Sequence, residues 1–359
     1  MLVSVWFTGM AQSGTSAFSF LGLPYSARLN ALGGSNVSLN DGELSMAMCN
    51  PALLSDSTDK MVQVNYSFLG AGQHFASAMY SHNFGPSSLE PDMEGKPNYF
   101  AVGVHFLHYG QFETADEYGN RPGTTFSAQD VLIDVVYARQ LGPMFTVGVS
   151  LKPIISSYDI YNAFALGADV GGHFVLPGKG LDVGLTLQNI GWQLKGFYTD
   201  EGGDSKLEML PLNLQLGLSY KLPHAPIRFS FTAHNLQRWD LSYQTANIGT
   251  KRGDELIQYY PTTNAKWYDM LFRHTIWALD IVPKSNKFWI TLSYNHRRRM
   301  ELNLKDLGAN VEQKSLAGFA LGLGLNIKGV RVGLAASQYT KSNYTFQFSL
   351  ALDVNQLMK

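Results

Sequence analysis

Large apolar side chains alternate with small polar ones along most of the chain after residue 60. Val62, Val64, Tyr66 and Phe68, for example, fall on one face of an extended chain. The alternation recurs in about fourteen segments of ~10–14 residues, the length expected of strands that cross a membrane. A period of two is what a β-strand requires when its two faces meet different surroundings. The pattern predicts an all-β, antiparallel fold of about fourteen strands.

The connections between these segments are short and long in turn. Tight turns are expected at 142–143, 176–179, 222–224, 283–285 and 328–329. Long connectors are expected at 109–127, 193–210, 238–271 and 299–314. A barrel in a bacterial outer membrane has short turns on its periplasmic side and long loops outside. Residues 60–359 are therefore predicted to form a transmembrane β-barrel with 238–271 as its long extracellular loop.

One connector does not follow this alternation. The segment 85–97 is long, although its place in the strand order is that of a periplasmic turn. Two interpretations remain open. Either this segment has a periplasmic role, or the strand count near the N-terminus is wrong.

The composition supports a lipid-facing surface. Only 15% of the 359 residues are charged, against roughly 25% in an ordinary soluble domain. The polar faces of the alternating segments consist mainly of Gly, Ser, Thr, Asn and Gln, which suits a lumen filled by a plug. The formal net charge of -1 argues against binding to nucleic acid. No stretch reaches the ~18 apolar residues of a transmembrane helix.

The first 59 residues lack the alternation. Residues 1–11 are apolar and end in Gly-Met-Ala, which resembles a signal-peptidase site, so they are predicted to be a residual signal peptide. The alternative is a buried N-terminal strand. Residues 12–59 are rich in small side chains and are predicted to form a hatch inside the barrel. Gly33 and Gly34 allow close backbone packing, and Asn50-Pro51 is a turn or helix-start signal.

Motifs for catalysis or for cofactor binding are missing from the sequence. The nine histidines and the single cysteine, Cys49, show no metal-ligand spacing, and neither a nucleophile motif nor a phosphate-binding loop occurs. The prediction is a protein that is not an enzyme and needs no metal or cofactor. Arg297, Arg298 and Arg299 form a basic run that either touches lipopolysaccharide phosphates or is a solvated strand end.

The connector 238–271 is the candidate partner-binding loop. It carries five large aromatic side chains, Trp239, Tyr259, Tyr260, Trp267 and Tyr268, and has room for a short amphipathic helix within 256–272 that Pro261 interrupts. Aromatic loops on a rigid scaffold are suited to docking a protein. The alternatives are a lid over the barrel mouth and a ring of side chains at the membrane interface.

The hatch segments 31–34 (Ala-Leu-Gly-Gly) and 50–52 (Asn-Pro-Ala) resemble the N-terminal hatch of FadL-like outer-membrane barrels. Within that group the chain is most similar to the PorQ family of the type IX secretion system of Bacteroidota. The similar stretches are 18–21, 24, 26–28, 50–55, 156–158, 163–167, 188–191, 222–226 and 232–236.

This resemblance implies a component of the attachment complex of that secretion system. Its members anchor a PorZ-like surface protein beside the sortase PorU and a PorV-type barrel. There, cargo proteins are cleaved and joined to lipopolysaccharide, and the barrel itself is not the catalyst. The resemblance assigns no residue-level site.

Two other functions remain as alternatives. A FadL-like transporter of hydrophobic small molecules would need an apolar lumen near the hatch, and the Gly, Ser, Asn and Gln residues here argue mildly against one. A soluble β-enzyme or lectin would need charged outer faces and a convergent polar site, and the sequence has neither.

Overall fold

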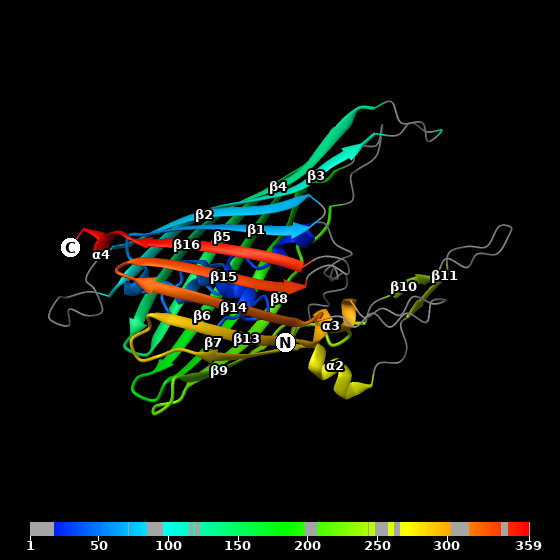
Figure 1. Ribbon diagram of the computed structural model, residues 1–359. Helices are drawn as coiled ribbons and strands as arrows, with labels where there is room; N and C mark the ends of the chain where they lie inside the picture. The colour runs from blue at the N-terminus through cyan, green and yellow to red at the C-terminus, as the bar shows by residue number, and fades with distance from the viewer. Residues whose placement is uncertain are drawn as a thin grey trace, which may run out of the picture.

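The computed structural model describes residues 18–70, 72–84, 96–114, 118, 123–197, 207–242, 244–247, 258–261, 266–302, 316–338 and 344–358. Fourteen of the strands that it describes close into one antiparallel barrel (Figure 1). Strand β1 pairs with both β2 and β16, which closes the sheet and removes its edges. The predicted fold class is confirmed.

The barrel strands are β1 Met61–Gly70, β2 Gln73–Phe84, β3 Asn98–Glu113, β4 Thr125–Gly142, β5 Phe145–Tyr158, β6 Tyr161–Leu176, β7 Leu181–Lys195, β8 Asn213–Lys221, β9 Ile227–Ala233, β12 Thr275–Ile281, β13 Phe288–Asn295, β14 Phe319–Ile327, β15 Val330–Gln338 and β16 Tyr344–Asp353. Two further strands, β10 Gln244–Asn247 and β11 Gln258–Pro261, pair only with each other.

The two faces of the barrel have opposite chemistry. In β1 the residues from Met61 to Phe68 alternate strictly between buried and exposed. The outward faces of the other strands carry exposed aliphatic and aromatic side chains, among them Val104, Val149, Leu185, Leu218, Leu292, Leu323, Leu334 and Phe348. An apolar outer belt of this kind is suited to contact with hydrocarbon. Closure of the barrel adds to this, because it leaves no strand edge with unpaired backbone groups in the membrane.

The ends of the barrel differ as well. Short connections join β4 to β5, β6 to β7, β8 to β9, β12 to β13 and β14 to β15, and we name their side the turn end. The opposite side is the loop end. There β5 and β6 are joined by residues 159–160 alone, so the predicted alternation of short and long connections does not hold at this hairpin. Strand β4 has 18 residues and β9 only 7, so the wall is tall near β3 and β4, which project beyond their neighbours at the loop end (Figure 1).

Two connector predictions change. Both ends of the connector predicted at 109–127 are strand instead, because β3 runs to Glu113 and β4 starts at Thr125. The segment 85–97 does join β2 to β3 at the turn end, since Asn83 near the end of β2 bonds Asp59 beside the start of β1. The strand count near the N-terminus is therefore correct, and the length of this connector is a feature of the protein.

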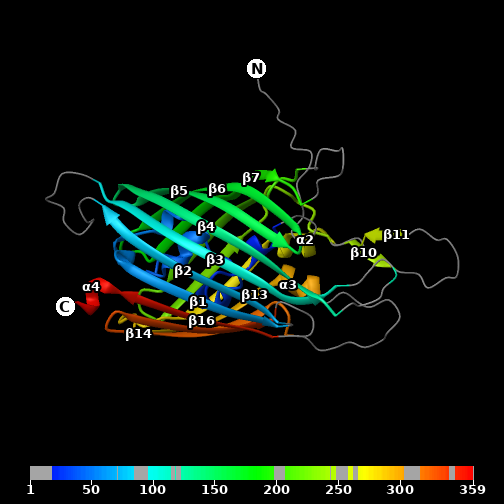
Figure 2. The same ribbon diagram turned by 90° about the horizontal axis from the view of Figure 1, so that it is seen from above.

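The hatch fills the barrel (Figure 2). Its described part begins at residue 18, and the predicted signal peptide 1–11 lies outside the described residues. It consists of η1 Ser19–Gly22, α1 Ala27–Ala31, η2 Leu44–Met48, η3 Pro51–Leu53 and η4 Asp56–Thr58. Leu29 and Leu44 are fully buried. Such side chains contribute about 1.5–3 kcal/mol each on burial, so apolar packing holds the hatch together.

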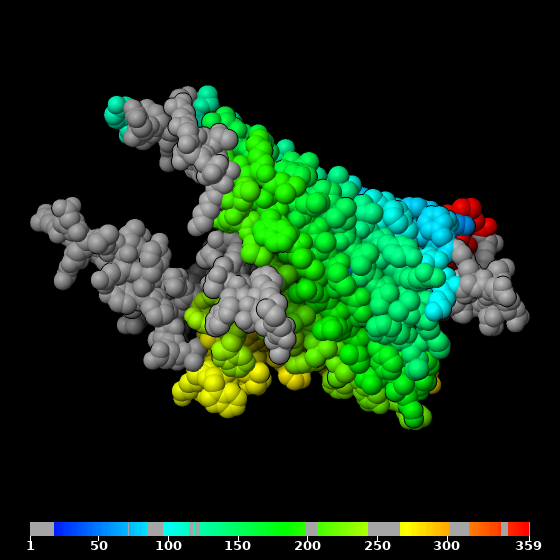
Figure 3. All heavy atoms as spheres, turned by 180° about the vertical axis from the view of Figure 1, so that it is seen from behind, coloured from blue at the N-terminus to red at the C-terminus, as the bar shows by residue number. Residues whose placement is uncertain are grey.

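Glycines in the wall allow the hatch to approach the strands closely. A Cβ on Gly184 would collide with the Val37 carbonyl oxygen, and one on Gly148 would lie 2.5 Å from the backbone of Pro51. Both positions belong to the wall that Figure 3 shows from outside, where β4 to β7 form a continuous surface. In the described part of the chain, no helix is both long and apolar enough to cross a membrane.

Candidate functional site

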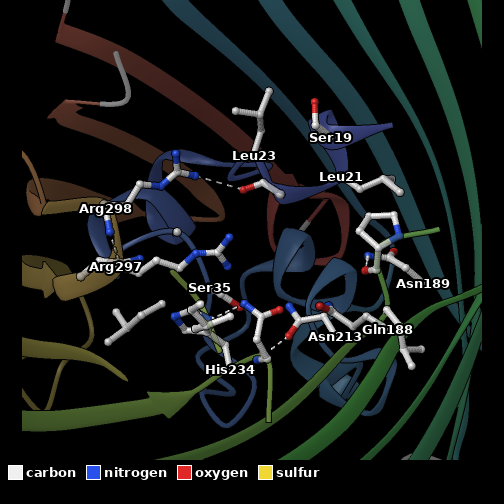
Figure 4. A pocket seen from close by; sticks show the side chains of 18 of the residues that line it. Ser19, Leu21, Leu23, Ser35, Gln188, Asn189, Asn213, His234, Arg297 and Arg298 are labelled. Carbon is white, nitrogen blue, oxygen red and sulfur yellow. Dashed lines mark hydrogen bonds between the residues drawn. The ribbon is translucent and has the colours of Figure 1, made fainter. Parts of the chain in front are cut away.

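A cavity of about 400 Å³ opens between the hatch and the loop end of the barrel. We name it the vestibule. Leu21, Leu23 and Gly34 of the hatch form its floor, and Gln188 and Asn213 contribute from the wall (Figure 4). The rest of the lining includes His234, Asn235, Gln237, Arg238, Asn295, Arg297, Arg298 and Glu301. Pro211, Leu212, Leu241 and Ile276 also line the vestibule, so its wall carries apolar as well as polar groups.

The floor depends on the two predicted hatch glycines. Gly33 has φ of 87° and Gly34 has φ of 105°, in the left-handed region where side chains other than glycine are strained. They end α1, and the Gly34 N–H donates to the Leu29 carbonyl at 2.9 Å. The Gly33 carbonyl accepts from Asn295 Nδ2 at 3.0 Å. The glycines thus terminate a helix and tie it to β13.

The predicted Asn50-Pro51 pair holds the opposite side of the hatch. Asn50 caps η3 by accepting from the Ala52 N–H at 3.0 Å, and Pro51 is the first residue of that helix. Asn50 Nδ2 donates to the carbonyls of Val37 at 2.8 Å and Gly172 at 3.1 Å. This amide therefore joins two hatch segments to strand β6, which is a structural task.

Buried charges fasten the hatch to the wall at a second point. Arg28 of α1 is 1% exposed and donates to both carboxylate oxygens of Asp280 at 3.1 and 3.0 Å. Arg228 of β9 reaches the same carboxylate at 2.8 Å, and both arginines contact Asp41 of the hatch. The Arg28 guanidinium also lies 4.5 Å from the centre of the Trp289 ring. We name Arg28, Asp41, Arg228 and Asp280 the hatch lock.

Sequence reasoning missed the hatch lock. It described the inward faces as poor in charge, whereas the structure pairs several of their charges with the hatch or with each other. Lys152 and Asp169, on neighbouring strands, form another buried ion pair. The sequence did contain a signal for such buried ion pairs. Asp280, Arg228 and Lys152 lie at inward positions in strands whose residues alternate between polar and apolar, and an unpaired charge there would be costly. Sequence alone does not say which partner each one meets.

Two short helices stand at one side of the loop end, α2 Trp267–Arg273 and α3 His296–Leu302. Asp269 of α2 accepts from His296 at 2.8 Å and from Arg273 at 2.9 Å. Burial alone would raise the pKa of Asp269, but the hydrogen bond from His296 and the charge of Arg273 outweigh it and lower this pKa below its ordinary value. A charged Asp269 thus fastens α2 to α3.

The predicted partner-binding aromatics are brought together in part. The Trp239 ring stacks on His274 at 5.6 Å, and the following segment joins α2, since the Leu241 carbonyl accepts from Arg273. Trp267 is 70% exposed and Tyr268 45% exposed, and their rings meet edge to face at 6.1 Å. Both residues lie on α2, so a short helix is present in the second part of the predicted range 256–272 and ends at Arg273. Pro261 does not interrupt it, because Gln258–Pro261 is strand β11.

Tyr259 and Tyr260 belong to β11, and the structure describes their backbone but not their side chains. The predicted basic run begins α3. Arg297 pairs with Glu301 at 3.0 Å, and Arg298 donates to the Gly22 carbonyl at 3.4 Å. Two of these arginines therefore face the vestibule and the hatch. Among the described residues, no three His, Cys, Asp or Glu side chains converge as a metal site would require.

The fold is shared with solved barrels of the FadL type. The deltaS2 mutant of the TodX monoaromatic hydrocarbon channel matches with a TM-score of 0.50 and 13% identity, over 93% of this chain and 98% of that one. The P. putida toluene transporter TodX matches at 0.44 and 12% identity, over 92% and 96%. A Pseudomonas aeruginosa FadL homologue matches at 0.43 and 10% identity, over 92% and 98%.

At 13% identity the first of these likenesses concerns the fold alone, and it agrees with the predicted outer-membrane barrel. No protein-family model matches the chain. No curated protein matches it either.

Proposed function

We propose that this chain is a non-enzymatic outer-membrane barrel whose loop end anchors a surface protein, as a member of the type IX secretion attachment complex. The partner is a PorZ-like protein, held near the sortase PorU and a PorV-type barrel where cargo is joined to lipopolysaccharide. In this proposal the turn end faces the periplasm and the connector 238–271 faces the outside.

The observation that carries the proposal is the hatch lock. Asp280 is fully buried between two arginines, and Arg28 is 1% exposed. Withdrawing the hatch would separate these charges inside the barrel, and removing one partner of a buried pair costs about 3–5 kcal/mol. A hatch held in this way favours a closed barrel that serves as a rigid platform, because a conduit requires its plug to move or loosen.

The vestibule, whose lining is about as polar as it is apolar, gives weaker support to the same function. A pocket for a hydrophobic molecule is lined mainly by apolar and aromatic side chains. Here Arg297, Arg298 and Glu301 stand at the rim, with amide side chains along the wall. The resemblance to the PorQ family adds to this, since its motif 26–28 contains Arg28 of the lock and the helix-capping Ser26, whose Oγ accepts from the Leu29 N–H at 3.2 Å.

A deletion in the long connector tests the anchor. Residues 244–261, which include β10 and β11, are replaced by a short Gly-Ser linker in the tagged full-length protein. This change keeps Leu241 and α2, which pack against each other through Met270. Surface proteins that co-purify in detergent are then identified by mass spectrometry. We expect a stoichiometric surface protein with the unaltered chain and its loss with the deletion.

Deletion of 303–315, another loop-end connector, is the matched control and should leave the partner bound. Heat-modifiable migration on a gel checks that each variant is a closed barrel. The deletion keeps Trp239, Trp267 and Tyr268, so a second variant replaces these three loop aromatics by serine in the deleted chain. The anchor proposal is wrong if partner recovery survives in that second variant, or if no protein accompanies the unaltered chain.

The second candidate is a FadL-like transporter of hydrophobic small molecules. The fold likeness to hydrocarbon channels favours this candidate and says nothing for the first. The partly apolar vestibule floor, with Leu21 and Leu23, is where such a molecule would first bind.

Uptake of radiolabelled toluene and oleate by cells that make the protein separates the two candidates. Uptake above that of cells without the protein, lowered by Leu21→Asp in the vestibule floor, would support the transporter. Lys284→Asp in a turn-end connection is the control and should leave uptake unchanged. No uptake together with a bound surface protein would support the anchor.

A further inference from the structure

Two parallel rows of large side chains cross the lipid-facing side of β8, β9, β12, β13 and β14. Strand register places Leu218, Phe231, Trp277, Tyr294 and Phe319 side by side in the first row. Tyr220, Phe229, Leu279 and Leu292 are neighbours in the second. Outward residues of one strand lie two positions apart, so the rows are separated by roughly 7 Å.

A cavity of about 460 Å³ lies between these rows. Its floor includes Ser230, Ala278 and Ser293, the residues between the two rows on their strands, which are small and buried. We name this feature the lipid-face groove. Its width suits one extended hydrocarbon chain, and its walls are almost wholly apolar or aromatic. It is part of the outer belt and separate from the vestibule.

The groove is inclined across the membrane belt. Phe319 is the first residue of β14 and Tyr294 the last but one of β13, so this part of the groove lies at the loop end. Tyr220 is the last but one residue of β8, beside the turn end. Barrel strands are tilted by about 35–45°, and a row perpendicular to them therefore descends from the loop-end margin into the belt.

A cation stands at the loop-end margin of the groove. Arg299 of α3 packs against Gly318, directly before Phe319, where a Cβ on the glycine would lie 2.9 Å from the arginine Cβ. Tyr294 lies beside it, with its hydroxyl 2.8 Å from His296 Nδ1, and both Arg299 and Asp269 are close enough to act electrostatically on that hydroxyl. Arginine matches phosphate oxygens in geometry and charge. The apolar groove therefore starts beside a group that binds phosphate.

We propose that the lipid-face groove binds one acyl chain of a membrane lipid whose phosphate headgroup lies at Arg299 and Tyr294. Two observations select a lipid over a protein segment. The groove is continuous with the outer belt, which meets hydrocarbon along its whole circumference, and its cation lies at the margin where headgroups begin. The groove does not depend on whether the barrel anchors a partner or transports a solute.

Quenching of Trp277 by lipids with brominated acyl chains tests this proposal. The full-length protein in detergent micelles is titrated with brominated phosphatidylglycerol or phosphatidylcholine, and the same titration with Trp277→Phe isolates the signal of Trp277. We expect the anionic lipid to quench at lower concentration. Arg299→Gln should raise that concentration roughly tenfold, since a charge-assisted hydrogen bond is lost.

Two matched controls separate the site from general effects. Leu292→Phe narrows the groove and should weaken quenching, whereas Leu334→Phe, at an equally exposed lipid-facing position outside it, should not. Lys328→Gln, in a turn-end connection, removes one positive charge far from Arg299 and should change nothing. Heat-modifiable migration verifies that every variant remains a closed barrel.

Three outcomes would overturn the proposal. Equal quenching by the two lipids would show that the headgroup is not recognised. Unchanged quenching in Leu292→Phe would show that the acyl chain does not bind in the groove. A photo-crosslinking residue at Leu279 in cells identifies the occupant directly. A crosslinked product with the added mass of a lipid supports the proposal, and one with the mass of a protein contradicts it.

Discussion

Replacing Asp280 by asparagine is the sharpest test of the hatch lock. Asp280 is fully buried on β12 and accepts from Arg28 and Arg228, with distances of 2.8–3.1 Å. Asparagine has nearly the same shape, so the packing is kept, while the negative charge and one of the two acceptor oxygens are lost. Two buried guanidinium groups then share Asp41, whose side chain is 18% exposed. The expected cost is about 3–5 kcal/mol, as for other broken buried ion pairs.

Removing both partners should cost much less than removing one. In Arg28→Met with Asp280→Leu, the buried charges of this pair are replaced by apolar groups of similar volume, which is often neutral in other proteins. The double variant should therefore be more stable than Asp280→Asn alone. A double-mutant cycle yields the coupling free energy of the pair. Asp159→Asn, at an exposed turn residue, is the control and should stay within about 0.5 kcal/mol of the unaltered protein.

Hydrogen exchange is the appropriate measurement because the barrel and the hatch contribute separately. Amides of α1 should exchange faster in Asp280→Asn, while amides in the middle of β4 and β5 keep their protection. Gel migration should still report a closed barrel. If the α1 amides exchange as slowly as in the unaltered protein, the lock does not hold the hatch, and the argument for a closed platform fails with it.

Three further predictions concern the wall and the loop end. Gly171→Val should cost about 1–3 kcal/mol of stability by overpacking, because its Cβ would collide with Asn50 of the hatch. The outward Gly172→Val is the control and should be tolerated, and thermal unfolding compares the two variants. Leu323→Arg should cost about 2–4 kcal/mol if it lies near the bilayer midplane, and Ile327→Arg at the turn end about 0–1 kcal/mol, measured by refolding into vesicles. The pKa of Asp269 is lowered in the folded protein, so its contribution to holding α2 is complete above its ordinary value near 3.8 and is lost as pH falls through the lower folded pKa. Protection factors of the α2 amides at neutral pH and at about pH 2, each corrected for the intrinsic exchange rate, measure this.

Each of these has an opposite result that counts against the structure. Equal stability of the two glycine variants would mean that the hatch does not touch that strand. An equal loss of stability in Leu323→Arg and Ile327→Arg would contradict the assignment of a lipid-facing belt. A smaller protection factor for α2 at neutral pH than in acid, after correction for the intrinsic exchange rate at each pH, would reverse the sign expected of a lowered carboxyl pKa.

Much of the fold was predictable because a strand with unlike surroundings must alternate with a period of two. The outward positions of β1, such as Val64 and Tyr66, follow directly from that period. The ends of β3 and β4 were harder to predict. Beyond the membrane both faces of a strand meet water, so the alternation fades while the pairing continues to Glu113 and Thr125.

Some residues of the candidate sites were likewise predictable from the sequence, and others were not. Gly33, Gly34, Asn50 and Pro51 were recognisable because a left-handed backbone and a helix cap have strong residue preferences. The partner-binding role of the loop aromatics stays a prediction. Trp239 stacks on His274, and that contact has no sequence signature because the two residues are 35 positions apart.

The sequence by itself determined the class of this protein: a closed antiparallel barrel with an apolar outer face, a small-residue hatch and two unlike ends. These properties follow from local periodicity and turn chemistry. Only the tertiary structure decided which charges meet inside, because Arg28 and Asp280 are 252 residues apart and pair only when the barrel closes around the hatch. The lipid-face groove is likewise set by register across five strands, which no single segment encodes.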